Sequence, residues 1–146
     1  MLSKICKKVK ELGIKIDYIE MEDNGHFGIF NDLPVVLINP ILNELDTSLT
    51  LLHETAHFLN QDCDKYITNH FQNDNIEFQA NRYMIQEVMK MLDNEYDFTP
   101  DTNYMNIIDI LNLPYQLDGI IIDEFNSIIA DKFGLTTYHE SDYFYE

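Results

Sequence analysis

The spacing of apolar and polar residues divides the chain into a short strand-forming stretch and a larger helical part. Apolar residues recur at helical spacing over most of the chain, between residues that favour helix starts and helix ends. Helices are therefore expected at 2–12, from Asp46 or Thr47 to about Asn60, at 75–93, at 103–112 and at 116–132. Residues 61–74 are polar without a clear period, which favours a loop or an irregular crossing. Pro114 divides the last two helices, and Gly134 is expected to end the second of them.

Three short apolar runs between the first two helices predict β-strands. They lie at 14–21, 26–30 and 34–38. Asp23-Asn24-Gly25 and Asn31-Asp32 are turn-forming clusters, so neighbouring strands are expected to pair antiparallel across short turns. The predicted fold class is α+β, with a small three-stranded antiparallel sheet beside a helical majority.

Length and composition favour one domain over residues 1–146. Of the 146 residues 45% are hydrophobic, and the chain contains no repeat, low-complexity tract or linker. We expect a core formed by residues 14–92, followed by C-terminal helices within 103–132. The two cysteines, Cys6 and Cys63, lie far apart and are expected to be free thiols rather than metal ligands.

The N-terminal stretch is rich in lysine but has no unbroken apolar run behind it, which is unlike a signal peptide. No later segment approaches the roughly 20 apolar residues of a membrane span. These features predict a cytoplasmic protein without membrane association.

Charge is distributed unevenly along the chain. The formal net charge is −17, yet five of the nine basic residues lie within the first 15 positions. An acidic body repels phosphate backbones, so direct nucleic-acid binding is not expected. A basic protein partner, mimicry of DNA and an acidic surface that serves solubility alone all agree with this charge.

The segment His53-Glu54-Thr55-Ala56-His57 has the spacing of a zinc-binding helix. Residues four apart differ by about 40° around a helix axis, so both imidazoles project from one face. On a helical wheel His53, Glu54 and His57 share the polar half, and the leucines of the helix lie on the other half. The pattern predicts a zinc site, against the alternative of two exposed histidines without a ligand.

A carboxylate in the second long helix completes the donor set. Glu77 and Asn81 fall within the apolar arc of that helix, although both are polar. A carboxylate that faces a core needs a partner, and a zinc ion held by two neutral imidazoles supplies the missing charge. We therefore expect His53, His57 and Glu77 to bind one Zn²⁺, unless Glu77 is a solvated first-turn residue favoured by the helix dipole. Asn81 is expected to hydrogen-bond one of the two histidines.

Three protein ligands leave one coordination position open, as in catalytic zinc sites. Zinc in such a site acidifies water and polarises a carbonyl group, which enables hydrolysis at neutral pH. Glu54 is not a ligand in this arrangement. It is expected to accept a proton from the attacking water and to pass it to the leaving amine. The residues therefore predict a zinc peptidase.

The two motifs together resemble the ImmA/IrrE metallo-endopeptidases. The resemblance rests on His53-Glu54-Thr55-Ala56-His57, on Ile38-Asn39-Pro40 ahead of it and on Glu77-Phe78-Gln79-Ala80-Asn81, and it covers about residues 14–92. It implies a small zincin-like domain of the gluzincin type and zinc-dependent cleavage of a protein, often a helix-turn-helix repressor of a phage or mobile element. Many relatives have a Leu-Met-Pro turn after the second motif, whereas here Met84-Ile85-Gln86-Glu87 continues the helix.

Two other classes of function agree with the same residues and charge. One is a partner-binding module that sequesters a repressor without cutting it, and the other is an acidic DNA mimic. The residue that would stabilise the oxyanion of a peptidase also stays open, with Tyr66, His70 and Tyr83 as candidates. His26 and His139 are interpreted as ordinary surface histidines.

Overall fold

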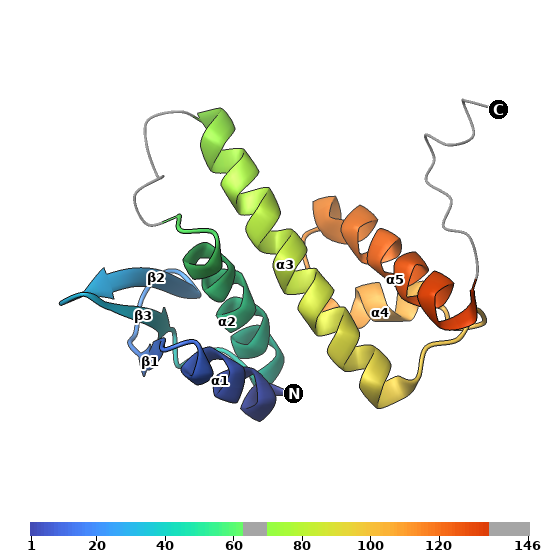
Figure 1. The fold of residues 1–146 in the computed structure, drawn as a ribbon, viewed down its shortest axis with the longest axis horizontal. Helices are drawn as coiled ribbons and strands as arrows, with labels where there is room; N and C mark the ends of the chain where they lie inside the picture. The colour runs from blue at the N-terminus through green and yellow to red at the C-terminus, as the bar shows by residue number, and fades with distance from the viewer. Residues whose placement is uncertain (63–69, 135–146) are drawn as a thin grey trace. The chain divides into compact units, whose positions relative to one another are not determined.

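The structure, a computed structural model, describes residues 1–62 and 70–134, apart from the side chains of 70–73. Along the chain lie α1 (Leu2–Glu11), β1 (Lys15–Tyr18), β2 (Gly25–Phe30), β3 (Leu33–Ile38), α2 (Glu44–Leu59), α3 (His70–Tyr96), α4 (Tyr104–Leu111), the 3₁₀ helix η1 (Tyr115–Leu117) and α5 (Asp118–Phe133) (Figure 1). The predicted α+β class with a helical majority is confirmed. Two compact units, Met1–Met84 and Ile85–Glu146, divide within α3, and the expectation of one domain over the whole chain stays a prediction.

The sheet belongs to the N-terminal unit and has the strand order β1-β3-β2. Strands β2 and β3 pair antiparallel, with Phe30 opposite Leu33. Between them Asn31 and Asp32 have positive φ angles of 52° and 64°. A two-residue type I′ turn requires positive φ at both central residues, and Asn and Asp tolerate it better than other non-glycine residues. The predicted hairpin at this turn is confirmed.

The prediction of an entirely antiparallel sheet is wrong for β1, which pairs with β3 in parallel. Strand β3 takes the central position, and its residues Val35, Val36 and Ile38 are buried. A central strand has no free edge, so the most apolar of the three segments is favoured there. Residues 19–24 connect β1 to β2 at the opposite edge of the sheet, and β3 then pairs with both strands between them.

Helix α2 begins earlier than predicted, at Glu44 rather than near Asp46 or Thr47. Asn43 is its N-cap, and the Asn43 Oδ1 accepts a hydrogen bond from the backbone N–H of Asp46 at 2.8 Å. This bond satisfies one of the free donors in the first turn, which is the role expected of an N-cap asparagine. Asp46 consequently lies inside the helix.

Helix α2 packs closely against the edge strand β2. The rings of Phe27 and Phe58 meet edge-on with centroids 5.9 Å apart. A Cβ atom at Gly25 would lie 2.5 Å from the Cγ2 of Thr50 and 2.9 Å from the carbonyl oxygen of Leu37, so only glycine fits where β2 begins. These contacts hold β2 beside the helix that carries the predicted metal ligands.

Helix α3 is longer than the predicted 75–93. Residues 70–74 belong to it, which corrects part of the expected irregular segment, whereas 63–69 lie outside the described residues. The segment His70-Phe71-Gln72-Asn73-Asp74 contains neither glycine nor proline, so nothing in it ends a helix. Its scarcity of apolar residues hides the helical period from a reading of the sequence.

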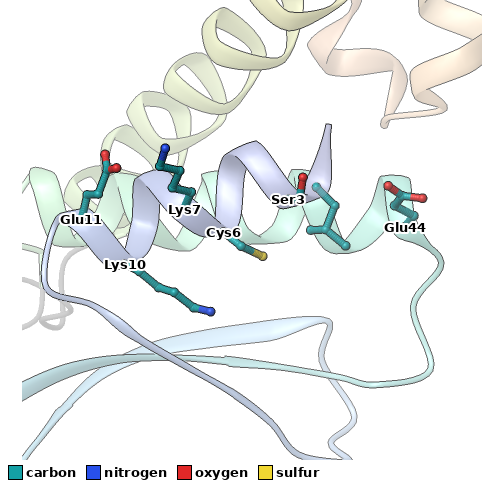
Figure 2. Close-up of a pocket in the computed structure, with 7 residues that line it drawn as sticks. Ser3, Cys6, Lys7, Lys10, Glu11 and Glu44 are labelled. Atoms are coloured by element: carbon teal, nitrogen blue, oxygen red, sulfur yellow. The ribbon is translucent and has the colours of Figure 1, made fainter.

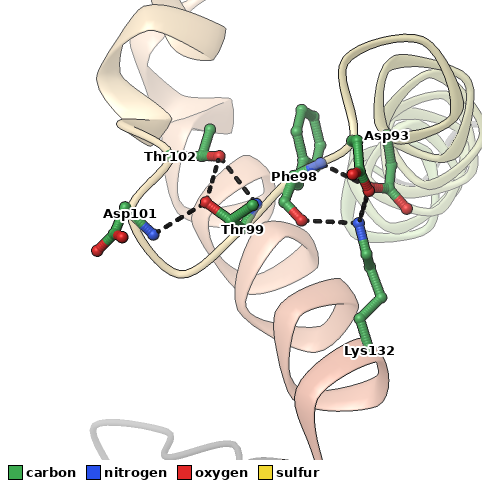
Figure 3. A network of polar contacts seen from close by, with 7 residues as sticks. Asp93, Phe98, Thr99, Asp101, Thr102 and Lys132 are labelled. Carbon is green, nitrogen blue, oxygen red and sulfur yellow. Dashed lines mark hydrogen bonds and ion pairs between the residues drawn. The ribbon is translucent and has the colours of Figure 1, made fainter.

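The C-terminal unit contains the end of α3 together with α4, η1 and α5. Phe98 is buried, with its ring centroid 5.6 Å from that of Phe125. The Nζ of Lys132 donates to Asp93 Oδ1 at 2.7 Å and to the carbonyl oxygen of Phe98 at 2.7 Å, which joins the last turn of α5 to the end of α3 (Figure 3). Gly134 ends α5 with a left-handed φ of 67°, as predicted.

No helix in the described parts of the chain combines the length and the apolar character needed to cross a bilayer.

Candidate metal centre

Helix α2 presents the two motif histidines on one side. The ring centroids of His53 and His57 lie 5.0 Å apart, and the rings are nearly perpendicular. The helical wheel places His57 on the polar half of the helix, but its side chain is only 4% exposed. Leu51, Leu52 and Ala56 anchor the helix in the core, and this packing sets the direction of the imidazoles.

Glu77 of α3 faces both histidines. Its Oε2 lies 2.9 Å from His53 Nε2, and its Oε1 lies 3.3 Å from His57 Nε2. One carboxylate therefore spans the two nitrogens that point away from the α2 backbone. Residues 24 and 20 positions apart in the sequence meet here because α2 and α3 both belong to the N-terminal unit at this point.

The prediction that Glu77 faces the core is wrong, because its side chain is 44% exposed. Ile76, Ala80 and Met84 are the buried residues of this part of α3, whereas Phe78, the neighbour of Glu77, is 47% exposed. Glu77 lies beside the buried stripe and opens to a cavity. Its position is thus set by the two imidazoles rather than by burial of its charge.

The donor set of these three residues fits zinc. His53, His57 and Glu77 each offer one donor atom, and these atoms all lie within 4.8 Å of one another. Ligand atoms bound tetrahedrally at 2.0–2.2 Å from zinc are separated by about 3.3–3.6 Å. The distance of 3.3 Å between Glu77 Oε1 and His57 Nε2 lies in this range, whereas that of 2.9 Å between Glu77 Oε2 and His53 Nε2 is shorter, so the side chains would move apart slightly to hold an ion. Two imidazoles and one carboxylate are also a donor set typical of catalytic zinc.

Asp62 supports this arrangement from behind His57. Its Oδ2 lies 3.1 Å from His57 Nδ1, and its side chain is 3% exposed. A carboxylate at this nitrogen favours the tautomer with the proton on Nδ1, which leaves the Nε2 lone pair free for a metal.

The end of α2 brings Asp62 to this place. The backbone N–H of Asp62 donates to the carbonyl oxygen of His57 at 2.9 Å, and that of Gln61 donates to Phe58 at 3.1 Å. Gln61 has a left-handed φ of 55°. This pair of bonds is a Schellman motif, which folds the chain back over the last helical turn. The sequence offered one hint, an acidic residue just after the second histidine, but its place depends on how the helix ends.

A comparison with protein families decides the assignment. The model of the peptidase M78 family, described as the IrrE N-terminal-like domain, matches residues 9–99. The chain belongs to this family. No match was found among curated proteins or among solved structures.

The peptidase M78 assignment confirms the resemblance inferred from the two motifs, and it covers both of them. It identifies a metallopeptidase-type protein from a metal-dependent family. The individual roles of His53, Glu54, His57 and Glu77 stay predictions that this geometry supports. The role of Asn81 also stays a prediction, since among the described residues no hydrogen bond joins its side chain to either imidazole.

The candidate metal-binding group of His53, His57 and Glu77 opens into a cavity of about 620 Å³. Its lining comprises Asp23, His26, Phe27, Gly28, His53, Glu54, His57 and Glu77. Strand β2 and the connection before it thus form one wall, and α2 with Glu77 forms the other. His26, interpreted as an ordinary surface histidine, is exposed but belongs to this cavity, which corrects that interpretation.

Two titratable groups of the cavity are shifted from their ordinary values. Burial raises the pKa of Glu54, and the nearby histidines only partly oppose this effect. Burial disfavours the charged form of His57, but hydrogen bonds to Glu77 and Asp62 outweigh it and raise the pKa of His57. A carboxyl group that is easily protonated at its site is suited to proton transfer.

A second and more open groove runs along α1, away from these residues (Figure 2). Cys6, Lys7 and Lys10 line it together with Glu44 at the start of α2. Cys6 is a free thiol, as predicted, whereas Cys63 lies outside the described residues. Among the described residues, only the group of His53, His57 and Glu77 brings three metal donors together, so the chemistry belongs to the cavity beside β2.

Proposed function

We propose that the protein is a zinc-dependent endopeptidase whose metal is held by His53, His57 and Glu77. The observation that carries the proposal is the convergence of the two Nε2 atoms on one carboxylate, at 2.9 and 3.3 Å, inside a cavity that also contains Glu54. Zinc at this position would act as a Lewis acid that acidifies water and polarises the carbonyl group of a peptide bond.

Glu54 moves the proton in the proposed reaction. Its carboxylate accepts a proton as water adds to the carbonyl carbon, and it returns that proton to the amine nitrogen as the C–N bond breaks. The raised pKa of Glu54, caused by burial, supports this role because a weakly acidic carboxyl group accepts a proton more readily. Asp62 holds the His57 ring in the tautomer that binds metal.

An extended segment of another protein is the proposed substrate. Strand β2 is an edge strand, and residues 26–28 line the cavity. The free backbone groups of an edge strand can pair with an extended peptide, which would lay that peptide across the zinc site. The arrangement favours cleavage within a polypeptide over removal of terminal residues.

We further propose that the substrate is a DNA-binding repressor, as the resemblance to ImmA/IrrE proteins implies. The net charge of −17 supports this choice, because DNA-binding proteins are basic where they contact phosphates and an acidic enzyme would attract them. Repressors act in the cytoplasm, and the proposed reaction takes place there.

Metal analysis combined with cleavage tests the proposal. Protein purified without added metal should contain about one zinc per chain, and His57→Ala should lose it. Glu54→Gln should retain zinc but cut a helix-turn-helix repressor encoded beside its gene roughly 10²–10⁴-fold more slowly than the parent. A repressor that is bound but left intact by the zinc-loaded parent would indicate a sequestering module. Binding that high salt abolishes and that survives loss of the histidines would indicate a DNA mimic.

A further inference from the structure

His26 occupies a place in the cavity that the proposed reaction has not used. It lies on β2, opposite Leu37 of β3, and its side chain is exposed and lines the cavity. It lines the same cavity as Glu54 and the two motif histidines. No hydrogen bond or ion pair joins the His26 ring to any described residue. The ring is therefore available to a bound molecule.

A hydrogen-bond donor near the carbonyl oxygen accelerates hydrolysis of a peptide bond, in addition to the polarisation that zinc would supply. Negative charge develops on that oxygen as water adds to the carbon, and a placed N–H or O–H group stabilises it. Apart from the proposed zinc ligands, the side chains that line the cavity are those of Asp23, His26, Phe27, Gly28 and Glu54. Glu54 is already assigned to the attacking water, a carboxylate such as that of Asp23 accepts hydrogen bonds, and phenylalanine and glycine offer no polar side-chain atom. Among these described residues, His26 is the side chain that can donate.

Tyr83, Tyr66 and His70 are the other candidates for stabilising the oxyanion, and none of them has a described side chain that lines the cavity. Tyr83 lies beneath the ammonium group of Lys8, with the nitrogen 5.9 Å from its ring centroid, and does not line the cavity. Tyr66 lies outside the described residues, as does the side chain of His70.

We propose that His26 contacts the substrate and donates an N–H hydrogen bond to the carbonyl oxygen of the bond that is cut. The inference rests on the proposed peptidase function. Water forms the new C–O bond, the carbonyl electron pair moves to the oxygen, and His26 holds that oxygen by a hydrogen bond without giving up its proton. The oxygen re-forms the carbonyl group as the C–N bond breaks, and the amine receives its proton from Glu54.

The neighbouring packing keeps His26 at a defined place. Phe27, the next residue, is buried against Phe58 of α2. Gly25, the preceding residue, begins β2 in close contact with Thr50 of α2. Both anchors tie this end of β2 to the helix that carries His53, so His26 keeps its distance from the zinc site. A donor that is already in place needs no reorganisation during the reaction.

Two substitutions at His26 and one control test the proposal. His26→Ala removes the donor, whereas His26→Gln keeps an N–H group at a similar reach. Tyr18→Ala removes a ring of 53% exposure, also with a donor, from the opposite edge strand β1. Each zinc-loaded protein is assayed with dye-labelled casein for kcat and KM. Affinity for a set of phosphinic peptides, whose phosphinate oxygens resemble the oxyanion, is measured by calorimetry.

We expect His26→Ala to lower kcat roughly 10²–10³-fold and to weaken phosphinic peptide binding by a similar factor. His26→Gln should recover most of this loss, and Tyr18→Ala should match the parent. Zinc content and melting temperature should stay the same in all four proteins. Equal phosphinic peptide affinity in the parent and His26→Ala would overturn the role of His26 while leaving the peptidase intact, and so would loss of zinc in His26→Ala. A zinc-loaded parent that neither cuts casein nor binds any phosphinic peptide would overturn the peptidase and the role of His26 together.

Discussion

Replacing Asp62 with asparagine should weaken zinc binding while preserving the fold. The Asp62 side chain is 3% exposed and lies 3.1 Å from His57 Nδ1, so water does not compete for this hydrogen bond. Asparagine keeps the shape of aspartate, but its neutral oxygen is a weaker acceptor than a carboxylate. The His57 ring then donates less electron density through Nε2 and is held less firmly in the tautomer that binds metal.

The expected loss of zinc affinity is about 10–100-fold, the range for outer partners of metal-binding histidines. This loss corresponds to about 1.4–2.8 kcal/mol of binding free energy. Asp17 provides the matched control, because its carboxylate is 45% exposed and pairs at 3.4 Å with the exposed Lys15. Asp17→Asn removes the same charge from the protein, so it should leave zinc affinity unchanged.

Competition with a chromophoric chelator gives the zinc Kd of the parent and both variants. Melting curves in excess chelator show whether each variant is folded, so that weak binding is not mistaken for unfolding. An Asp62→Asn protein that is folded and has the Kd of the parent would refute the role assigned to this hydrogen bond. Equal weakening in Asp17→Asn would attribute the effect to net charge instead.

Three further predictions follow from the geometry of the site. Glu77→Gln should weaken zinc binding in the chelator competition assay but barely change the melting temperature of the metal-free protein at about pH 8, since the Glu77 side chain is 44% exposed; a large drop in that temperature would contradict this account. Because folding raises the pKa of His57, protonation of this residue stabilises the metal-free protein at pH values below its pKa in the unfolded chain, which is near 6.5. This stabilisation is lost as the pH rises through the pKa of His57 in the folded protein. The chelated parent should therefore melt at a higher temperature at about pH 6 than at about pH 8, and His57→Gln should reduce that difference, as calorimetry can measure. Gln61→Gly should raise the free energy of unfolding by up to about 1 kcal/mol in urea titrations, because glycine adopts the left-handed conformation of Gln61 without strain; an unchanged or lower value would argue against strain there.

Local chemistry in the sequence was sufficient for several features. The four-residue spacing of His53 and His57 places both on one side of any helix, so their proximity needs no tertiary information. Asn31 and Asp32 tolerate positive φ and thereby encode the hairpin turn. Gly134 ends α5 because glycine adopts positive φ without strain. Each of these features depends on residues only a few positions apart.

Strand order and the remaining parts of the site required the tertiary structure. The central place of β3 depends on which strand buries both faces, and turn residues do not encode that choice. Glu77 lies on the apolar arc of an isolated wheel, yet the cavity beside α2 leaves it half-exposed and in contact with both imidazoles. Asp62 reaches His57 through the Schellman turn, and His26 reaches the cavity because β2 packs on α2. Sequence periodicity describes one element at a time, whereas a catalytic cavity forms from the surfaces that several elements leave unfilled.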